Sequence, residues 1–129
     1  MIDSSDQLET LNPYVSRETI KKLSDYRDSI ISAKFNLVSK KDKDHIWIRH
    51  FHDSLRLRKF FEKNSKKIKI LDIGSGAGLP GLPLSMVLDN DLFEFVLCES
   101  NNKKANFIKD CCDQLDISNV QIINNRVEN

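Results

Sequence analysis

The chain has 129 residues, of which 40% are hydrophobic and 30% charged, and its formal net charge is +1. These values are typical of one soluble globular domain, and the apolar runs are too short to cross a membrane. The polar, acidic residues after Met1 exclude a secretory signal, so we expect a cytoplasmic protein. Cys98, Cys111 and Cys112 have no metal-ligand or disulfide spacing, which predicts buried or idle thiols and no metal site.

The charges are unevenly distributed along the chain. Residues 1–67 carry 15 basic and 10 acidic side chains, whereas residues 68–129 carry 5 basic and 9 acidic ones. A basic amino-terminal part is compatible with a polyanionic partner. The same excess is also compatible with solvated lysine-rich linkers.

The amino-terminal half is predicted to be helical after a polar, loosely packed lead-in over residues 1–15. Ser16 can cap a first helix, and Asp44 can cap a second. Apolar side chains recur at helical spacing along both: Ile20, Leu23, Ile30 and Ile31 in the first, and Trp47, Ile48, Phe51 and Leu55 in the second. Trp47 shares this spacing, so we interpret it as a core residue, and we interpret His45 and His52 as structural.

From residue 68 onward, strands and helices are predicted to alternate. Short apolar runs predict strands at 68–73, 93–99 and 120–124, and helices are predicted at 81–88 and 101–115. This order indicates an α/β fold with a parallel sheet and right-handed crossovers.

Three strands would leave one face and one edge of the sheet open. We therefore expect residues 1–129 to be the front part of a longer domain whose carboxyl-terminal strands are missing. Within it we expect a basic helical part, residues 1–67, and a βαβαβ part, residues 68–129.

All four glycines of the chain fall in residues 74–81, which we call the glycine loop. Gly74, Gly76 and Gly78 occupy alternate positions directly after the first strand. An open α/β sheet binds its ligand at this carboxyl end, and glycine lets a ligand approach the backbone closely. Glu99 ends the second strand, where a carboxylate can accept hydrogen bonds from a ribose diol.

Two ligand classes suit such a loop. A dinucleotide fingerprint beginning at Gly74 would require glycine at position 79, which is Leu79. The observed D-x-G-x-G-x-G pattern suits a nucleoside with an amino-acid tail, as in S-adenosylmethionine (SAM). A nicotinamide-binding half-domain remains the less favoured alternative.

Four spaced segments resemble the bacterial 16S rRNA guanine-N7 methyltransferases of the RsmG (GidB) family. They are DIGSGAGLPGLPLS from Asp72, FNLVS from Phe35, WIRHFHDSLRL from Trp47 and NNRVEN from Asn124. The resemblance implies a Rossmann-like SAM-dependent methyltransferase fold, a parallel sheet with flanking helices, preceded by amino-terminal helices.

The resemblance also implies roles for individual residues. Cofactor contacts or loop shape fall to Gly74, Gly76, Gly78, Leu79, Glu99, Val127 and Glu128, with Glu99 standing where the family usually has Asp. Arg49, His50 and Arg126 correspond to positions near the RNA-binding face. From the sequence alone these three would be ordinary surface or structural residues.

The implied activity is methyl transfer from SAM to N7 of a guanine in 16S rRNA, with 16S rRNA or the small ribosomal subunit as partner. We expect a monomer without a membrane or metal partner, and no catalytic acid or base. A truncated, inactive fragment that binds SAM or RNA is the alternative.

Overall fold

The computed structural model describes residues 2–62 and 66–125, and the three strands in these residues form one parallel sheet in the order β1-β2-β3. The strands are β1 (Ile68–Ile73), β2 (Phe93–Cys98) and β3 (Val120–Ile123). Helix α4 (Gly81–Val87) joins β1 to β2, and α5 (Asn102–Gln114) joins β2 to β3. The α/β fold with parallel strands is therefore confirmed.

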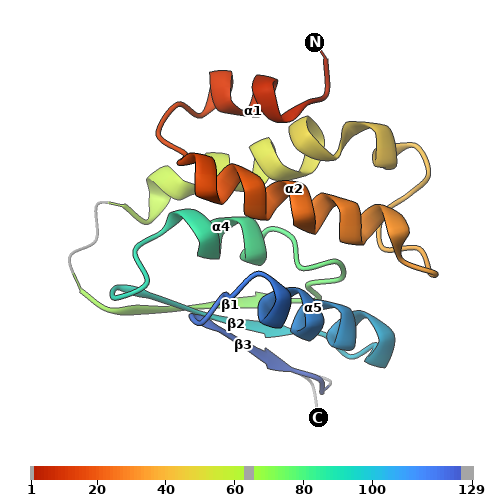
Figure 1. The fold of residues 1–129 in the computed structure, drawn as a ribbon. Coiled ribbons are helices and arrows are strands. Elements are labelled where there is room, and N and C mark those ends of the chain that lie inside the picture. The colour runs from red at the N-terminus through yellow and green to blue at the C-terminus, as the bar shows by residue number, and fades with distance from the viewer. Residues whose placement is uncertain (1, 63–65, 126–129) are drawn as a thin grey trace.

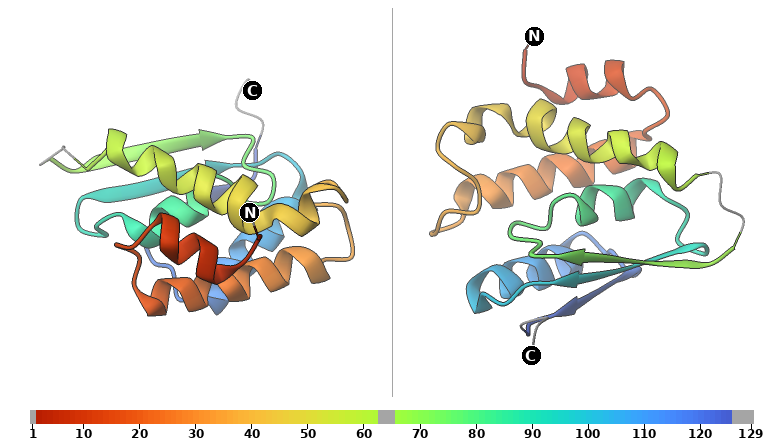
Figure 2. Two further views of the ribbon diagram at one scale, coloured as in Figure 1. Left: turned by 90° about the horizontal axis from the view of Figure 1, so that it is seen from above. Right: turned by 180° about the vertical axis from the view of Figure 1, so that it is seen from behind.

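The helices lie in layers on one side of the sheet (Figure 1). Helices α4 and α5 pack on the sheet, and α2 (Arg17–Ser32) packs on α4 together with the helical segment of residues 42–60. Helix α1 (Ser5–Leu11) is the outermost element and contacts that segment. The view from behind in Figure 2 shows the opposite face of the sheet without a covering helix.

The segment of residues 42–60 is helical but irregular. It consists of a 3₁₀ turn η1 (Asp42–His45), a π-helical stretch η2 (Ile46–His52), one turn α3 (Asp53–Leu55) and a 3₁₀ turn η3 (Arg56–Phe60). Trp47 is 5% exposed, and its ring meets the edge of the Phe51 ring with centroids 5.4 Å apart. The interpretation of Trp47 as a core residue is confirmed.

The prediction of a loosely packed lead-in over residues 1–15 is wrong. These residues contain α1, whose N-terminus is capped by the Ser4 hydroxyl, which accepts a hydrogen bond from Gln7 N at 3.1 Å. Leu8 is fully buried, which contributes about 2 kcal/mol. A seven-residue helix that buries a single leucine has no apolar repeat for a sequence pattern to detect.

The prediction that Asp44 caps the second helix is also wrong. Asp44 makes no side-chain cap there, and the free N–H groups of Trp47 and Ile48 donate instead to the two carboxylate oxygens of Asp3, at 3.3 and 2.9 Å. The cap comes from a residue more than forty positions earlier in the chain. The amino terminus therefore closes the end of η2 and fixes α1 against it.

The exposure of the strand side chains shows which face of the sheet the helices cover. Along β1 the side chains alternate in exposure, and Leu71 and Ile73 are 57% and 59% exposed. They point away from the helices, whereas Phe95 and Leu97 of β2 are fully buried beneath α4 and α5. No helix in residues 2–62 and 66–125 is long and apolar enough to span a membrane.

The Asp3 cap gives a direct stability test. Replacing Asp3→Ala removes both acceptors and is expected to lower the free energy of unfolding by about 1 kcal/mol, measured by urea denaturation. Asp3→Asn retains one oxygen and should lose less. Asp6→Ala removes another acid of the same region, in the first turn of α1, and should cost only a few tenths of a kcal/mol. Equal losses for Asp3→Ala and Asp6→Ala would contradict a specific cap.

Candidate functional site

The glycine loop begins where β1 ends and is tied to the neighbouring strand. Gly74 N and Ser75 N both donate to the carbonyl of Cys98, at 2.8 and 3.2 Å. The loop then folds on itself, because Gly78 N and Leu79 N donate to the carbonyl of Ser75 at 2.8 and 3.2 Å. Hydrogen bonds within the loop and to β2 thus hold the loop backbone at the carboxyl end of the sheet.

Two glycines of the loop face open space. Gly74 and Gly76 have φ angles of +73° and +58°, and a Cβ atom added at either would meet nothing within 4 Å. A positive φ strains any residue with a side chain, so glycine is favoured at both positions. The open space beside the backbone is where a ligand can come into direct contact with the loop.

The other two glycines are required by packing. A Cβ at Gly78 would lie 2.8 Å from Leu82 Cδ1 and 3.0 Å from Tyr26 Oη. A Cβ at Gly81 would collide with the Leu97 side chain. The first pair therefore leaves open space beside the backbone, and the second pair allows close packing around α4.

Glu99 lies beside the open pair and is 8% exposed. Its Oε1 accepts a hydrogen bond from Gly76 N and its Oε2 accepts one from Asn101 N, both at 2.8 Å. The carboxylate thus joins the glycine loop to the start of α5. Each carboxylate oxygen has a second lone pair, so these bonds leave one acceptor site on each oxygen for a ligand hydroxyl.

Asp72 also holds the glycine loop through hydrogen bonds to its side chain and to its backbone carbonyl. Its Oδ2 accepts a hydrogen bond from Gly81 N at 3.3 Å, and the Ser75 hydroxyl donates to its backbone carbonyl at 3.2 Å. Burial raises the pKa of the Asp72 carboxyl above its usual value of 3.8, and hydrogen bonds from Gly81 and Ser75 partly oppose this effect.

Tyr26 is the residue of the site that the sequence reasoning missed. It is fully buried on α2, and its hydroxyl donates to the carbonyl of Ala77 in the glycine loop at 2.5 Å. Its ring stacks on Phe51 with centroids 5.3 Å apart. Burial raises its pKa well above 10.0, so the hydroxyl keeps its proton and remains a donor. The available signal was its position on the same helix face as Leu23 and Ile30.

The predicted RNA-side residues lie next to this loop. Arg49 and His50 line a depression of about 240 Å³ together with Leu79 and Pro80. The structure therefore brings the two predicted RNA-side residues into one surface feature with the loop position Leu79, although about thirty residues separate them in the chain.

Both side chains are held by Asp42. Arg49 Nη1 lies 3.3 Å from Asp42 Oδ1, and His50 Nε2 lies 3.5 Å from Asp42 Oδ2. The pKa of the Asp42 carboxyl is lowered, chiefly by a hydrogen bond to Ser39 and then by Arg49 and His50. His50 Nε2 is buried and makes no hydrogen bond within the described residues. The other predicted site residues, Arg126, Val127 and Glu128, lie outside the residues that the structure describes.

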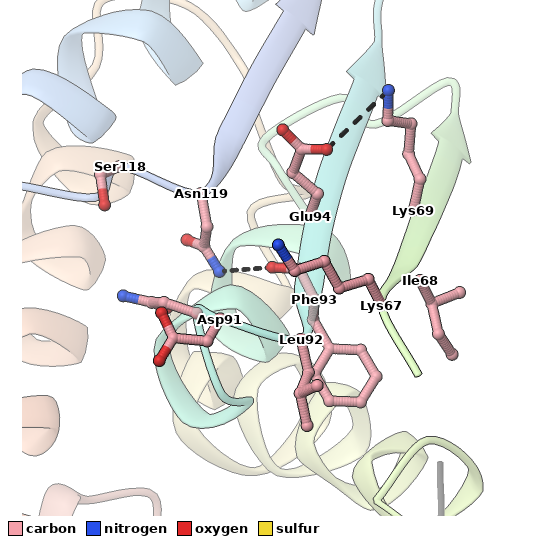
Figure 3. Close-up of a pocket in the computed structure, with 10 residues that line it drawn as sticks. Lys67, Ile68, Lys69, Asp91, Leu92, Phe93, Glu94, Ser118 and Asn119 are labelled. Carbon is pink, nitrogen blue, oxygen red and sulfur yellow. Dashed lines mark hydrogen bonds and ion pairs between the residues drawn. The ribbon is translucent and has the colours of Figure 1, made fainter. Parts of the chain in front are cut away.

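A second cavity, of about 730 Å³, lies at the opposite, amino end of the strands (Figure 3). Lys69 Nζ is 3.8 Å from Glu94 Oε2, and Asn119 Nδ2 donates to the carbonyl of Phe93 at 3.3 Å. No glycine or Glu99 lines this cavity. It is separate from the carboxyl end of the sheet, where the loop and the acidic side chains converge.

The three thiols are buried and free, as predicted. Burial raises the pKa of Cys111 to about 12 and that of Cys112 to about 11, so both stay protonated at neutral pH and are poor nucleophiles. Residues 2–62 and 66–125 contain no group of three or more His, Cys, Asp or Glu side chains arranged to hold a metal ion.

The fold is that of the Rossmann-like methyltransferases. A solved protein-L-isoaspartate O-methyltransferase superposes on 95% of this chain and 42% of its own with a TM-score of 0.57, at 17% sequence identity. The family model GidB, described as rRNA small subunit methyltransferase G, matches residues 19–129. The chain belongs to this family.

Individual relatives agree with the family match. Proteins named ribosomal RNA small subunit methyltransferase G are 39% identical over 97 residues in Oenococcus oeni, 38% over 116 in Mycoplasma mycoides and 37% over 122 in Orientia tsutsugamushi. The matches cover 75%, 88% and 92% of this chain. They span 39%, 82% and 58% of the respective relatives.

The Tyr26 hydrogen bond can be tested by removing one atom. Tyr26→Phe leaves the Ala77 carbonyl buried without its donor, so the free energy of unfolding should fall by about 1 to 3 kcal/mol in urea denaturation. Tyr14→Phe is the control, because Tyr14 is 39% exposed and loss of its hydroxyl should cost less than about 0.5 kcal/mol. A smaller loss for Tyr26→Phe than for Tyr14→Phe would refute the role assigned to Tyr26.

Asp72 gives a pH-dependent prediction. A raised pKa in the folded protein means that this carboxyl contributes full stability below pH 3.8 and loses it as pH rises through the raised value. Asp72→Asn removes this loss and keeps an oxygen for Gly81 N. The stability of the variant relative to the native chain should therefore increase from below pH 3.8 to neutral pH, measured by urea denaturation at each pH. A flat or decreasing difference would argue against burial as the cause.

Proposed function

We propose that this protein binds S-adenosylmethionine at the glycine loop and transfers its methyl group to N7 of a guanine in 16S rRNA. The observation that carries the proposal is the family match over residues 19–129. The relatives are named as methyltransferases of small-subunit ribosomal RNA, which gives the substrate class.

The residues of the loop fit this donor. Gly74 and Gly76 have open space beside their backbone, and Glu99 has acceptor capacity left for the ribose hydroxyls. Leu79 is proposed as a further contact of the donor. Val127 and Glu128 would lie beside the adenine, and Gly78 would shape the turn. S-adenosylmethionine supplies a methyl group activated by its sulfonium.

The proposed chemistry requires little proton transfer from the protein. N7 of guanine carries a free lone pair, so no general base is needed at the acceptor atom. The protein would act by holding the two reactants in line and by excluding water. In this proposal the carboxylates of Glu99 and Asp72 hold the loop by accepting backbone N–H groups and do not transfer protons.

The RNA would approach from the side of the helical segment. Arg49 and His50 lie in the same depression as Leu79, which supports their assignment to the RNA side, and Arg126 is proposed for the same role. Cationic contacts to phosphates supply affinity without sequence choice. The guanine would have to be unpaired or splayed out to reach the loop.

We further propose a division of the chain into an RNA-binding part, residues 1–67, and a donor-binding part, residues 68–129, within one domain. The protein would act as a cytoplasmic monomer on 16S rRNA or on the small ribosomal subunit. The proposed reaction needs no metal ion.

Calorimetric titration tests the donor site. The native chain should bind S-adenosylmethionine and not NAD, because the dinucleotide fingerprint is interrupted at Leu79. Gly76→Ala places a methyl group in the open space and should weaken donor binding by about tenfold or more while the protein still unfolds cooperatively. Gly78→Ala should lose more stability than Gly76→Ala, because its methyl group meets Leu82 and Tyr26 in addition to the strain of a positive φ that both variants share.

The same titration identifies the rival functions. Binding of NAD alone would replace the methyltransferase assignment by a dinucleotide site. Unchanged donor affinity in Gly76→Ala would show that the open glycines are not the contact surface. Methylation is then checked with tritiated donor and 16S rRNA or small subunits, followed by mapping of N7-methylguanine. Donor binding without any methyl transfer would indicate a binding fragment.

A further inference from the structure

The helical segment of residues 42–60 carries an excess of basic side chains and an exposed ring. It contains five Lys and Arg side chains against three acids, Asp42, Asp44 and Asp53. Phe60, at the end of η3, is 72% exposed, and this makes it the most exposed aromatic side chain in the described part of the chain. An exposed aromatic ring beside cations offers a stacking surface to a planar ligand group.

Phe60 differs from the other surface aromatic close to this segment. The Tyr14 ring is covered by the guanidinium of Arg58, 3.3 Å from its centroid, and Arg58 also pairs with Glu62. At Phe60, Lys59 Nζ lies 5.7 Å from the ring centroid. The Phe60 ring therefore combines high exposure with a neighbouring cation.

Two neighbouring depressions lie between Phe60 and the glycine loop. A depression of about 300 Å³ is lined by Asp53, Arg56, Leu57, Lys59 and Phe60. It shares Asp53 and Leu57 with the 240 Å³ depression that holds Arg49, His50, Leu79 and Pro80. We call these two depressions together the Phe60 track.

The charges along the Phe60 track suit a phosphate backbone. Arg56 is 3.6 Å from Asp53, and their side chains are 66% and 61% exposed, so this pair is weak and easily exchanged for a phosphate contact. Lys59 lies on the same turn. Cations that alternate with an aromatic ring bind single-stranded nucleic acid by combining phosphate contacts with base stacking.

We propose that the Phe60 track holds a single-stranded RNA segment next to the target guanine, with one base stacked on Phe60 and phosphates at Arg56 and Lys59. The inference rests on the proposed function, since it places the guanine at the loop end of the track. It adds a second contact point beyond Arg49 and His50. A base-paired helix could not present a free base face to Phe60.

Fluorescence anisotropy with a labelled single-stranded oligoribonucleotide tests the stacking contact. Phe60→Ala should weaken binding by about 5- to 100-fold, the range for loss of one stacked base, and Phe60→Trp should restore it. Leu71→Ala is the matched control, because it removes an exposed apolar side chain from the bare face of the sheet. The same sequence in a perfect duplex should bind more weakly than the single strand.

The phosphate contacts are tested by the salt dependence of binding. Lys59→Gln should reduce the slope of log affinity against log salt by about one contact, whereas Lys109→Gln on α5 should leave it unchanged. Native affinity in Phe60→Ala, equal binding of duplex and single strand, or no binding of single-stranded RNA by the native chain would each overturn the proposal. A requirement for Phe60 in binding another protein, but not RNA, would overturn it as well.

Donor titration of the same variants separates this proposal from the proposed function. Phe60→Ala should bind S-adenosylmethionine as the native chain does, because the depression that Phe60 lines contains no residue of the glycine loop. If the chain fails to bind the donor but loses RNA affinity on Phe60→Ala, the RNA track stands and the methyl-transfer assignment falls. If donor binding and methylation persist and Phe60→Ala binds RNA with native affinity, the methyl-transfer assignment stands and the RNA track falls.

Discussion

The hydrogen bond from the buried Tyr26 hydroxyl to the Ala77 carbonyl is the contact on which the arrangement of the site depends. Through this hydrogen bond, helix α2 contacts the glycine loop directly. The stacked Phe51 ring fixes Tyr26 from the other side and belongs to the same segment as Arg49 and His50. One aromatic pair therefore sets the distance between the loop and the basic surface, and a buried donor in this position makes that distance rigid.

The loop itself is held from three directions, and each restraint leaves the outer face of Gly74 and Gly76 free. Tyr26 holds it from the helical layer, Glu99 from the end of β2, and Asp72 from beneath. Preorganisation of this kind matters for a reaction that relies on alignment rather than on proton transfer. It also explains why a residue as costly to bury as Glu99 lies there: both of its oxygens accept backbone N–H groups.

The carboxyl-terminal half of the fold was readable from the sequence because its signals are local. Short apolar runs and helical spacing predicted β1, β2, β3, α4 and α5 within one or two residues of their bounds. Contacts between residues far apart in the chain could not be predicted from the sequence. The Asp3 cap, the Tyr26 hydrogen bond and the engagement of Glu99 by Gly76 N depend on pairing between residues tens of positions apart, which no periodicity reports.

The backbone of β1 also has one side without a neighbouring strand in the described residues. Ile68 N donates to Leu92 O and Gly74 N donates to Cys98 O, so the even-numbered amides of β1 are directed toward β2. By the same alternation the amides of Lys69, Leu71 and Ile73 are directed toward the other edge, where the described residues place no strand. In deuterated solvent, β1 would therefore show alternating slow and fast exchange, and so would β3 at the other edge of the described sheet, with every second amide protected only by the side chains around it.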